Sequence, residues 1–185
     1  MADYQIDSAL QATRHEIVDR HMTHENAHEF DDAIGAFHHP RYEIVATGEV
    51  WDGADGVDAL LKENKTGFSD FKFHPTKWHH AEDAIIVEGN FTGTHDGSWR
   101  GLPATYRTVD FELIIVFKFE DDRMVCERTY FDIGTALRQL GVARDPNTLG
   151  GKIELMAAHP VHVGRALARQ LVVSRRRGGS DAPAG

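Results

Sequence analysis

The stretch that decides the fold is RTVDFELIIVFKFEDDRMVCERTYFD, which runs from Arg107 to Asp132. Up to Phe119, apolar residues recur at every second position, which is the period of a β-strand with one buried face. The residues on that face are Val109, Phe111, Leu113, Ile115, Phe117 and Phe119. Glu120 to Arg123 then predicts a turn and Met124 to Tyr130 a second strand, so this stretch is a β-hairpin.

Two more long strands come before this hairpin. Phe71 to His80 and Ala84 to His95 have strand character, and Glu82 and Asp83 predict a tight turn between them. Asp96 to Pro103 is rich in glycine and predicts a loop. We therefore expect four long strands in hairpin order.

Helical patterns flank these strands. Asp7 or Ser8 is expected to cap a first helix, and Thr23 to cap or restart a second one with an apolar stripe. That stripe consists of Ala27, Phe30, Ile34 and Phe37. A short strand over Tyr42–Thr47, a helix over Asp55–Gly67 and a helix over Asp132–Gly141 follow. The pattern predicts an α+β fold in which helices cover one face of a curved antiparallel sheet.

The chain is expected to have one main domain and a C-terminal extension. Its 185 residues suit a single core, which we place in residues 1–141. Residues 142–175 are expected to be a linker, around Asp145 to Gly151, and a helix that begins near Pro160 with Val163, Leu167 and Leu171 on one face. Residues 176–185 are predicted to be a disordered tail.

Composition excludes several classes of partner. The formal net charge is −9, which argues against nucleic acid and against an anionic membrane surface as partners of the main domain. No apolar run approaches the roughly 20 residues that span a bilayer. Cys126 is the single cysteine, so an intrachain disulfide and a cysteine-based zinc site are excluded. These features favour the cytoplasm.

Three segments resemble the SnoaL-like branch of the NTF2-like superfamily, which includes polyketide cyclases, ester cyclases and ketosteroid isomerases. They are FTGTHDGSWRGLPATYR, from Phe91 to Arg107, then DDRMVCERTYFD, from Asp121 to Asp132, and finally QLG, from Gln139 to Gly141. The resemblance implies a cone: a bent sheet wrapped around N-terminal helices, with a pocket inside. One departure is Tyr106, which replaces the glycine of the family's PATGR, and it is expected to alter the loop at the pocket mouth.

The resemblance also implies candidate catalytic residues. In the cyclases of this family, an aspartate at the position of Asp132 serves as acid/base. A carboxylate in an apolar pocket has a raised pKa and can take a proton from a carbon next to a carbonyl. The alternative is that Asp132 only caps the helix that follows it. His95 is expected on the apolar face of its strand, where it would bind a substrate carbonyl, or else be a loop-edge histidine bonded to backbone.

The remaining candidates are expected to contact the ligand. Tyr130 and Arg128 precede Asp132 by two and four residues, so a regular strand points all three to one face, although a bulge would leave the inward face open. Tyr130 would donate to an enolate and Arg128 would bind a carboxylate or pair with an acid. Pocket-wall or binding positions are further assigned to Trp51, Trp99 and Arg107.

No metal and no cofactor are expected. His24 and His28 have the i, i+4 spacing that can bind one ion, but no third ligand can be assigned. No phosphate loop, dinucleotide fingerprint or nucleophile elbow is present. The Arg175–Arg177 run is read as the solvated end of a helix.

Two functions remain open. The first is cofactor-free proton transfer on a small apolar or carbonyl-containing molecule, as in a cyclase or isomerase. The alternative is a non-catalytic ligand-binding or accessory dimer with the same pocket. A homodimer is expected through the outer sheet face, because Ile114 and Val116 are apolar positions on an otherwise polar face.

Overall fold

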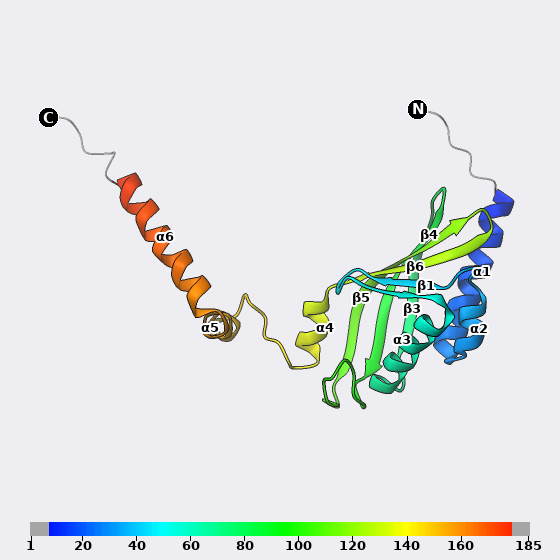
Figure 1. Cartoon of the computed structure of the whole chain (residues 1–185), viewed down its shortest axis with the longest axis horizontal. Helices are drawn as coiled ribbons and strands as arrows, with labels where there is room; N and C mark the ends of the chain where they lie inside the picture. The colour runs from blue at the N-terminus through cyan, green and yellow to red at the C-terminus, as the bar shows by residue number, and fades with distance from the viewer. Residues whose placement is uncertain (1–7, 179–185) are drawn as a thin grey trace. The chain divides into compact units, whose positions relative to one another are not determined.

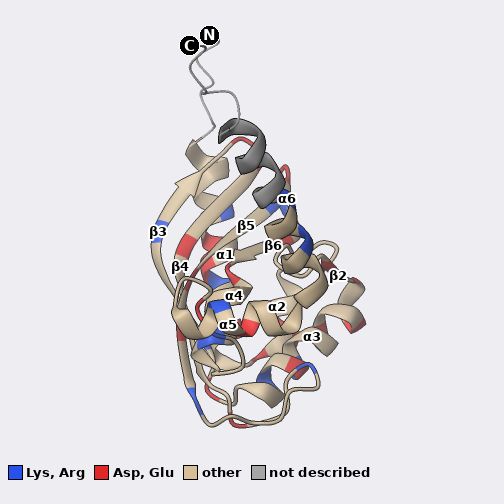
Figure 2. Cartoon of the chain, turned by 90° about the vertical axis from the view of Figure 1, so that its left-hand side faces the viewer, with Lys and Arg blue, Asp and Glu red and all other residues tan. Residues whose placement is uncertain are grey.

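We describe residues 8–178 in a computed structural model, with side chains up to residue 170. The chain divides into two compact units, Met1–Val142 and Ala143–Gly185. Figure 1 shows a sheet and helices in the first unit and helices alone in the second. The two units also differ in charge: residues up to Val142 include 13 basic and 26 acidic residues, and the rest 7 basic and 3 acidic. Figure 2 shows the charged positions of the described residues on the ribbon.

The first unit is built on one six-stranded sheet with the order β2-β1-β6-β5-β4-β3. The strands are β1 (Arg41–Ile44), β2 (Glu49–Asp52), β3 (Lys72–His80), β4 (Ala84–Thr94), β5 (Thr108–Glu120) and β6 (Arg123–Phe131). The four long strands pair in the expected antiparallel order. β1 pairs with β6 in parallel, so the short strands extend the sheet at one edge.

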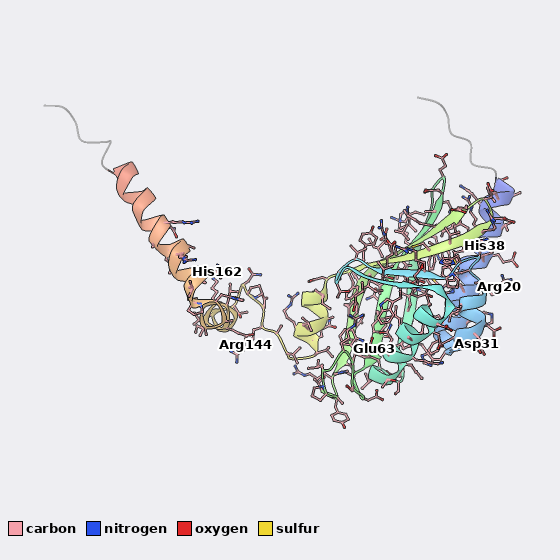
Figure 3. The ribbon with its side chains drawn as sticks, in the orientation of Figure 1. Arg20, Asp31, His38, Glu63, Arg144 and His162 are labelled. Carbon is pink, nitrogen blue, oxygen red and sulfur yellow. The ribbon has the colours of Figure 1, made fainter. Side chains whose placement is uncertain are left out.

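Helices pack on one face of this sheet. They are α1 (Ser8–Ala27), α2 (Phe30–Gly35), α3 (Gly53–Gly67) and α4 (Ile133–Gln139). Residues on the outer side of these helices, such as Arg20 of α1 and Asp31 of α2, are exposed (Figure 3). The predicted α+β architecture is confirmed.

The core lies where the sequence predicted it. Of the predicted apolar face of β5, Phe117 is fully buried, and Val109, Leu113, Ile115 and Phe119 are nearly so. Ile34 and Phe37 are buried against this face, and Phe30 is half-buried beside it. Burial of one strand face by a helical stripe is the main source of stability in such a fold.

In the first unit, three features differ from the predictions. α1 continues through Thr23, whose hydroxyl donates to the carbonyl of Asp19 at 2.8 Å, a bond that a mid-helix threonine makes readily. The break comes instead at His28, which has φ +61°. The short strand ends at Ile44, and β2 was not predicted. Gly48, with φ +74°, reverses the chain between them, as a residue without Cβ does easily.

The second unit consists of α5 (Leu149–Ala158) and α6 (Pro160–Gly178). α5 begins inside the predicted linker because Thr148 caps it, accepting a hydrogen bond from the Gly151 amide at 3.1 Å. α6 reaches three residues into the segment that was predicted to be disordered, consistent with the high helix propensity of arginine. Residues 179–185 lie outside the described residues. Within residues 8–178, no helix has the length and apolar character needed to cross a membrane.

Candidate functional site

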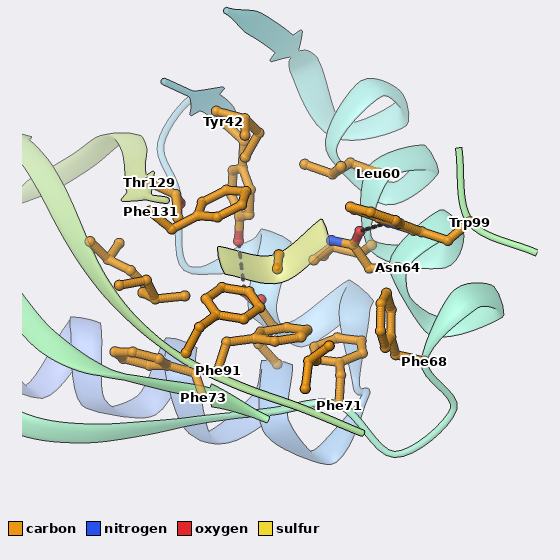
Figure 4. Close-up of a pocket in the computed structure, with 18 of the residues that line it drawn as sticks. Tyr42, Leu60, Asn64, Phe68, Phe71, Phe73, Phe91, Trp99, Thr129 and Phe131 are labelled. Atoms are coloured by element: carbon orange, nitrogen blue, oxygen red, sulfur yellow. Dashed lines mark hydrogen bonds between the residues drawn. The ribbon is translucent and has the colours of Figure 1, made fainter. Parts of the chain in front are cut away.

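An interior cavity of about 110 Å³ lies between the sheet and helices α1, α3 and α4. A cavity needs only about 10–15 Å³ to hold one water, so this one has room for a small ligand. Figure 4 shows aromatic and apolar side chains around it. Its lining includes Glu25, Tyr42, Asn64, Phe91, Trp99, Arg100, Phe111, Glu127, Thr129 and Phe131.

One wall of the cavity is a row of stacked phenylalanine rings. Ring centroids of Phe71 and Phe91 are 5.8 Å apart, those of Phe91 and Phe111 5.3 Å, and those of Phe111 and Phe131 5.4 Å. The planes of neighbouring rings differ by 14°, 25° and 28°. Phe91, Phe111 and Phe131 come from the adjacent strands β4, β5 and β6, where side chains on one face are neighbours, and Phe71 lies directly before β3. The wall suits a flat, apolar ligand.

A cluster of ionisable side chains forms the polar end of the cavity. Nε2 of His21 lies 3.1 Å from Oε2 of Glu127 and 3.3 Å from Oε2 of Glu25. The Tyr42 hydroxyl donates to Glu25 at 2.9 Å, as Figure 4 shows, and Thr129 donates to Oε1 of Glu127 at 3.2 Å. We call His21, Glu25, Tyr42 and Glu127 the acid cluster.

His21 is the cation of this cluster. Its Nδ1 lies 2.9 Å from the carbonyl oxygen of Ala33, so both ring nitrogens face acceptors. Burial opposes the charge, but hydrogen bonds to Glu127 and Glu25 outweigh it and raise the pKa of His21 to about 10. His21 is therefore an imidazolium at neutral pH.

Glu127 and Tyr42 hold their protons more tightly than usual. Burial, and then the charge of Glu25, raise the pKa of Glu127. Burial, followed by the charges of Glu127 and Glu25, raises the pKa of Tyr42 well above its ordinary value. A carboxylate with a raised pKa next to a neutral hydroxyl donor is an arrangement that handles protons near neutral pH.

A second polar group lies away from Tyr42 and Thr129 in Figure 4. Nε1 of Trp99 donates to Oδ1 of Asn64 at 3.2 Å. Arg100 pairs through Nη1 with Glu49 and lies with its guanidinium carbon 5.2 Å from the centre of the Trp99 ring. Three elements meet here: α3, β2 and the loop after β4.

The structure places Asp132 outside this cavity. Its carboxylate caps α4, accepting from the Gly134 amide at 2.8 Å and from the Thr135 hydroxyl at 2.6 Å, with Arg138 at 3.1 Å. The hydrogen bond from Thr135, together with those from Gly134 and Arg138, outweighs the opposing effect of burial and lowers the pKa of Asp132. Its side chain is 64 % exposed. Its role as acid/base stays a prediction.

Arg128 and Tyr130 share the outer face with Asp132, as a regular strand requires. Tyr130 lines an outer hollow together with Asp132. Arg128 donates through Nε to Glu43 at 2.6 Å. The alternate residues of β6, Glu127, Thr129 and Phe131, are the ones that line the interior cavity.

His95 is fully buried beside Phe68, with ring centroids 5.1 Å apart. Its Nδ1 accepts from the Thr105 amide at 3.1 Å, which places the ring proton on Nε2. Burial lowers its pKa, so it is neutral. His95 is not among the cavity-lining residues.

Of the other predicted contacts, Trp99 lines the cavity, whereas Trp51 is half-buried and packs against the core. Arg107 is exposed, and the arginine that lines the cavity is Arg100. Tyr106 has φ +56°, in the region that favours glycine, which agrees with the glycine of the family at this position.

A metal could be held by either of two groups among the described residues: His21, Glu25 and Glu127, or the more exposed His24, Glu29 and Asp32. In the first group each carboxylate already accepts hydrogen bonds from His21 and from a hydroxyl. His28 is not in either group; its ring contacts Lys65 and the Phe71 carbonyl. The expected absence of a metal stays a prediction.

The acid cluster was not predicted from sequence. His21 and Glu25 are four residues apart on α1, so they lie on one face of that helix. Glu127 and Arg128 are neighbours on β6, so their side chains point to opposite faces of the sheet. Only the fold joins residues 21, 25, 42 and 127. The sequence offered one signal. Residues at every second position of β6 share a face, and the apolar Phe131 indicated that its face, which includes Glu127, points inward.

Comparison with known proteins identifies the fold. The family model of the SnoaL-like polyketide cyclases matches residues 15–140. A protein from Jannaschia sp. CCS1 assigned to these cyclases superimposes with a TM-score of 0.64 at 18 % identity, covering 76 % of this chain and 99 % of its own. AclR from Streptomyces galilaeus gives 0.64 at 21 % identity, covering 82 % and 97 %. TerC, crystallised with polyporic acid, gives 0.59 at 12 % identity, covering 70 % and 98 %. None of the curated proteins that were compared matches the chain.

Proposed function

Because the chain belongs to the SnoaL-like polyketide cyclase family, we propose that its interior cavity binds a small, flat carbonyl compound and moves a proton on a carbon next to the carbonyl. The observation that carries this proposal is the acid cluster at the polar end of an otherwise aromatic cavity. The apolar wall binds the carbon skeleton, and the cluster faces its reactive end.

The proton acceptor in this scheme is the carboxylate pair Glu25 and Glu127. The two side chains share the Nε2–H of His21, so we treat them as one acid–base unit and assign the transferred proton to the pair. The pair takes a proton from the carbon next to the carbonyl, and the electrons of the C–H bond move to the carbonyl oxygen to give an enolate. The same proton then returns to another carbon or to an oxygen, so the pair is regenerated.

Tyr42 and His21 stabilise the charge that this step moves. The Tyr42 hydroxyl keeps its proton because its pKa is raised, and it can donate to the enolate oxygen by turning from Glu25 to the ligand. His21 stays an imidazolium and keeps the carboxylate pair in place. No cofactor is required for these steps.

The alternative is that the protein only binds its ligand. Each carboxylate of the cluster is hydrogen-bonded within the protein, as in a buried network with a structural role. Such a cluster would orient a ligand without exchanging a proton with it.

Proton exchange separates the two functions without knowledge of the natural substrate. The probe is 2-tetralone, a bicyclic aromatic ketone, in deuterium oxide, and the readout is loss of its α-hydrogen signals by proton NMR. We expect the protein to accelerate exchange and Glu127→Gln to slow it by at least about a hundredfold, the usual size of a general-base effect. Glu16→Gln, an exposed change on α1, is the matched control. Binding of 2-tetralone with no acceleration would favour the non-catalytic alternative.

A further inference from the structure

Arg100 points to a second recognition site in the cavity. We propose that Arg100, with the side-chain amide of Asn64, binds a carboxylate or another anionic oxygen group of the ligand, at a distance from the acid cluster. The inference rests on the proposed function only in taking the cavity as the ligand site.

Arg100 carries a buried donor without a partner. Among the described residues, three buried side-chain atoms have no hydrogen-bond partner, namely Trp51 Nε1, His95 Nε2 and Arg100 Nε. Of these three residues, only Arg100 lines the cavity. An unpaired buried donor is unfavourable, so a ligand group that reached Arg100 and supplied an acceptor would remove that penalty.

The backbone at Arg100 is also strained. Trp99 and Leu102 exchange two backbone hydrogen bonds, at 3.0 and 2.8 Å, and so close a two-residue turn. The residues inside it, Arg100 and Gly101, have φ +51° and +78°, as a type I′ turn requires. That turn favours asparagine or glycine at the position of Arg100. The strained turn places the Arg100 side chain in the cavity wall. Backbone strain of this kind is concentrated at ligand-binding sites.

Two contacts fix the position of the Arg100 guanidinium. Glu49 pairs with Nη1 and Trp99 lies under the guanidinium, which leaves Nε free of these contacts. Arginine is suited to planar carboxylates because its donors form a rigid fork.

The charged groups at the two ends of the cavity determine how the ligand is oriented. The acid cluster has two carboxylates and one imidazolium, so it repels an anionic group, whereas Arg100, whose Nη1 is paired with Glu49, has further guanidinium donors that can bind one. A ligand with a carboxylate at one end would therefore place its other end, with the reacting carbon, at Glu25 and Glu127. The inferred substrate class is a flat carbonyl compound with an anionic oxygen group remote from the reacting carbon.

A pair of matched probes tests this site. 2-Naphthoate and 2-naphthamide have the same rings and nearly the same shape but differ in charge. By isothermal titration calorimetry we expect the protein to bind 2-naphthoate at least about tenfold more tightly, and Arg100→Met to remove that preference. Arg100→Lys, which keeps the charge without the fork, should retain part of it. Arg20→Met on the exposed face of α1 is the control and should retain all of it.

Two results would overturn the proposal: equal affinity of the wild-type protein for the two probes, including no binding of either, or a full preference in a folded Arg100→Met protein. The outcome is independent of the proton-transfer chemistry, because Glu127→Gln should lose exchange of 2-tetralone and keep the preference for 2-naphthoate. A preserved preference with no exchange would reject catalysis and retain the Arg100 site.

Discussion

Nε2 of His21 lies 3.1 Å from Oε2 of Glu127, and both side chains are almost completely buried. A buried charge is tolerated only when it is paired and hydrogen-bonded. The fold brings these two residues together across 106 positions of sequence. The pairing has a consequence for stability that can be measured.

Stability should fall as the pH rises above neutral. The pKa of His21 is raised from 6.5 to about 10, so between these values the folded protein binds more protons than the unfolded chain. The stabilisation is complete below pH 6.5 and is lost as the pH approaches 10. Denaturant unfolding between pH 7 and 9.5 should show a slope of up to about 1.4 kcal/mol per pH unit. His21→Gln should flatten this slope, and an unchanged slope would show that His21 is not the group that titrates.

Tyr42→Phe should affect catalysis more than folding. The change removes one donor to Glu25, which costs about 1 kcal/mol of stability. It also removes the donor assigned to the enolate, so exchange of 2-tetralone should slow by about a hundredfold while its affinity changes little. Exchange at the wild-type rate in a folded Tyr42→Phe protein would take Tyr42 out of the mechanism.

Asp132 can be tested as cap and as catalyst separately. Asparagine caps a helix about as well as aspartate, so Asp132→Asn should change the free energy of unfolding by no more than about 0.5 kcal/mol, and Asp132→Ala should cost roughly 1 kcal/mol. From the exposed position of the carboxylate on the outer face, we expect Asp132→Asn to exchange 2-tetralone as the wild-type protein does. A hundredfold loss would instead support the acid/base role that the sequence predicted.

A homodimer through the outer sheet face remains a prediction. Ile114 is 42 % exposed there and Val116 is half-buried. Burial of these side chains against a second copy would remove apolar surface from water. Light scattering at micromolar concentration should give twice the chain mass, and Ile114→Lys should shift the protein toward the monomer. A monomeric wild-type protein would rule out this interface at that concentration.

The fold could be predicted because its strongest signals are local. The alternation of β5 continues over many residues, and each position is fixed by the two-residue period of a strand. β2 was missed because it is four residues long, with the half-buried Glu49 and Trp51 alternating with exposed residues. Its strand conformation comes from pairing with β1, which is a tertiary contact.

The site could be predicted only in part, because it depends on which of the two alternating sets of β6 side chains points inward. Arg128, Tyr130 and Asp132 were expected to share a face, and they do, but that face is the outer one. A shift of one residue exchanges all inward and outward side chains, and the register of β6 against β5 shifts near Lys118. Glu127 could therefore be identified as a cavity residue only from the structure.

In the proposed mechanism, Glu25 and Glu127 act as one acid–base unit. The most direct test is the rate of 2-tetralone exchange in Glu25→Gln, Glu127→Gln and the double variant, each confirmed as folded by circular dichroism. Residues that act as a unit give losses that do not multiply. We predict that the double variant is no slower than the slower single variant, with both single variants at least about a hundredfold below the wild-type rate. Losses that multiply, or single variants that exchange at the wild-type rate, would contradict the claim.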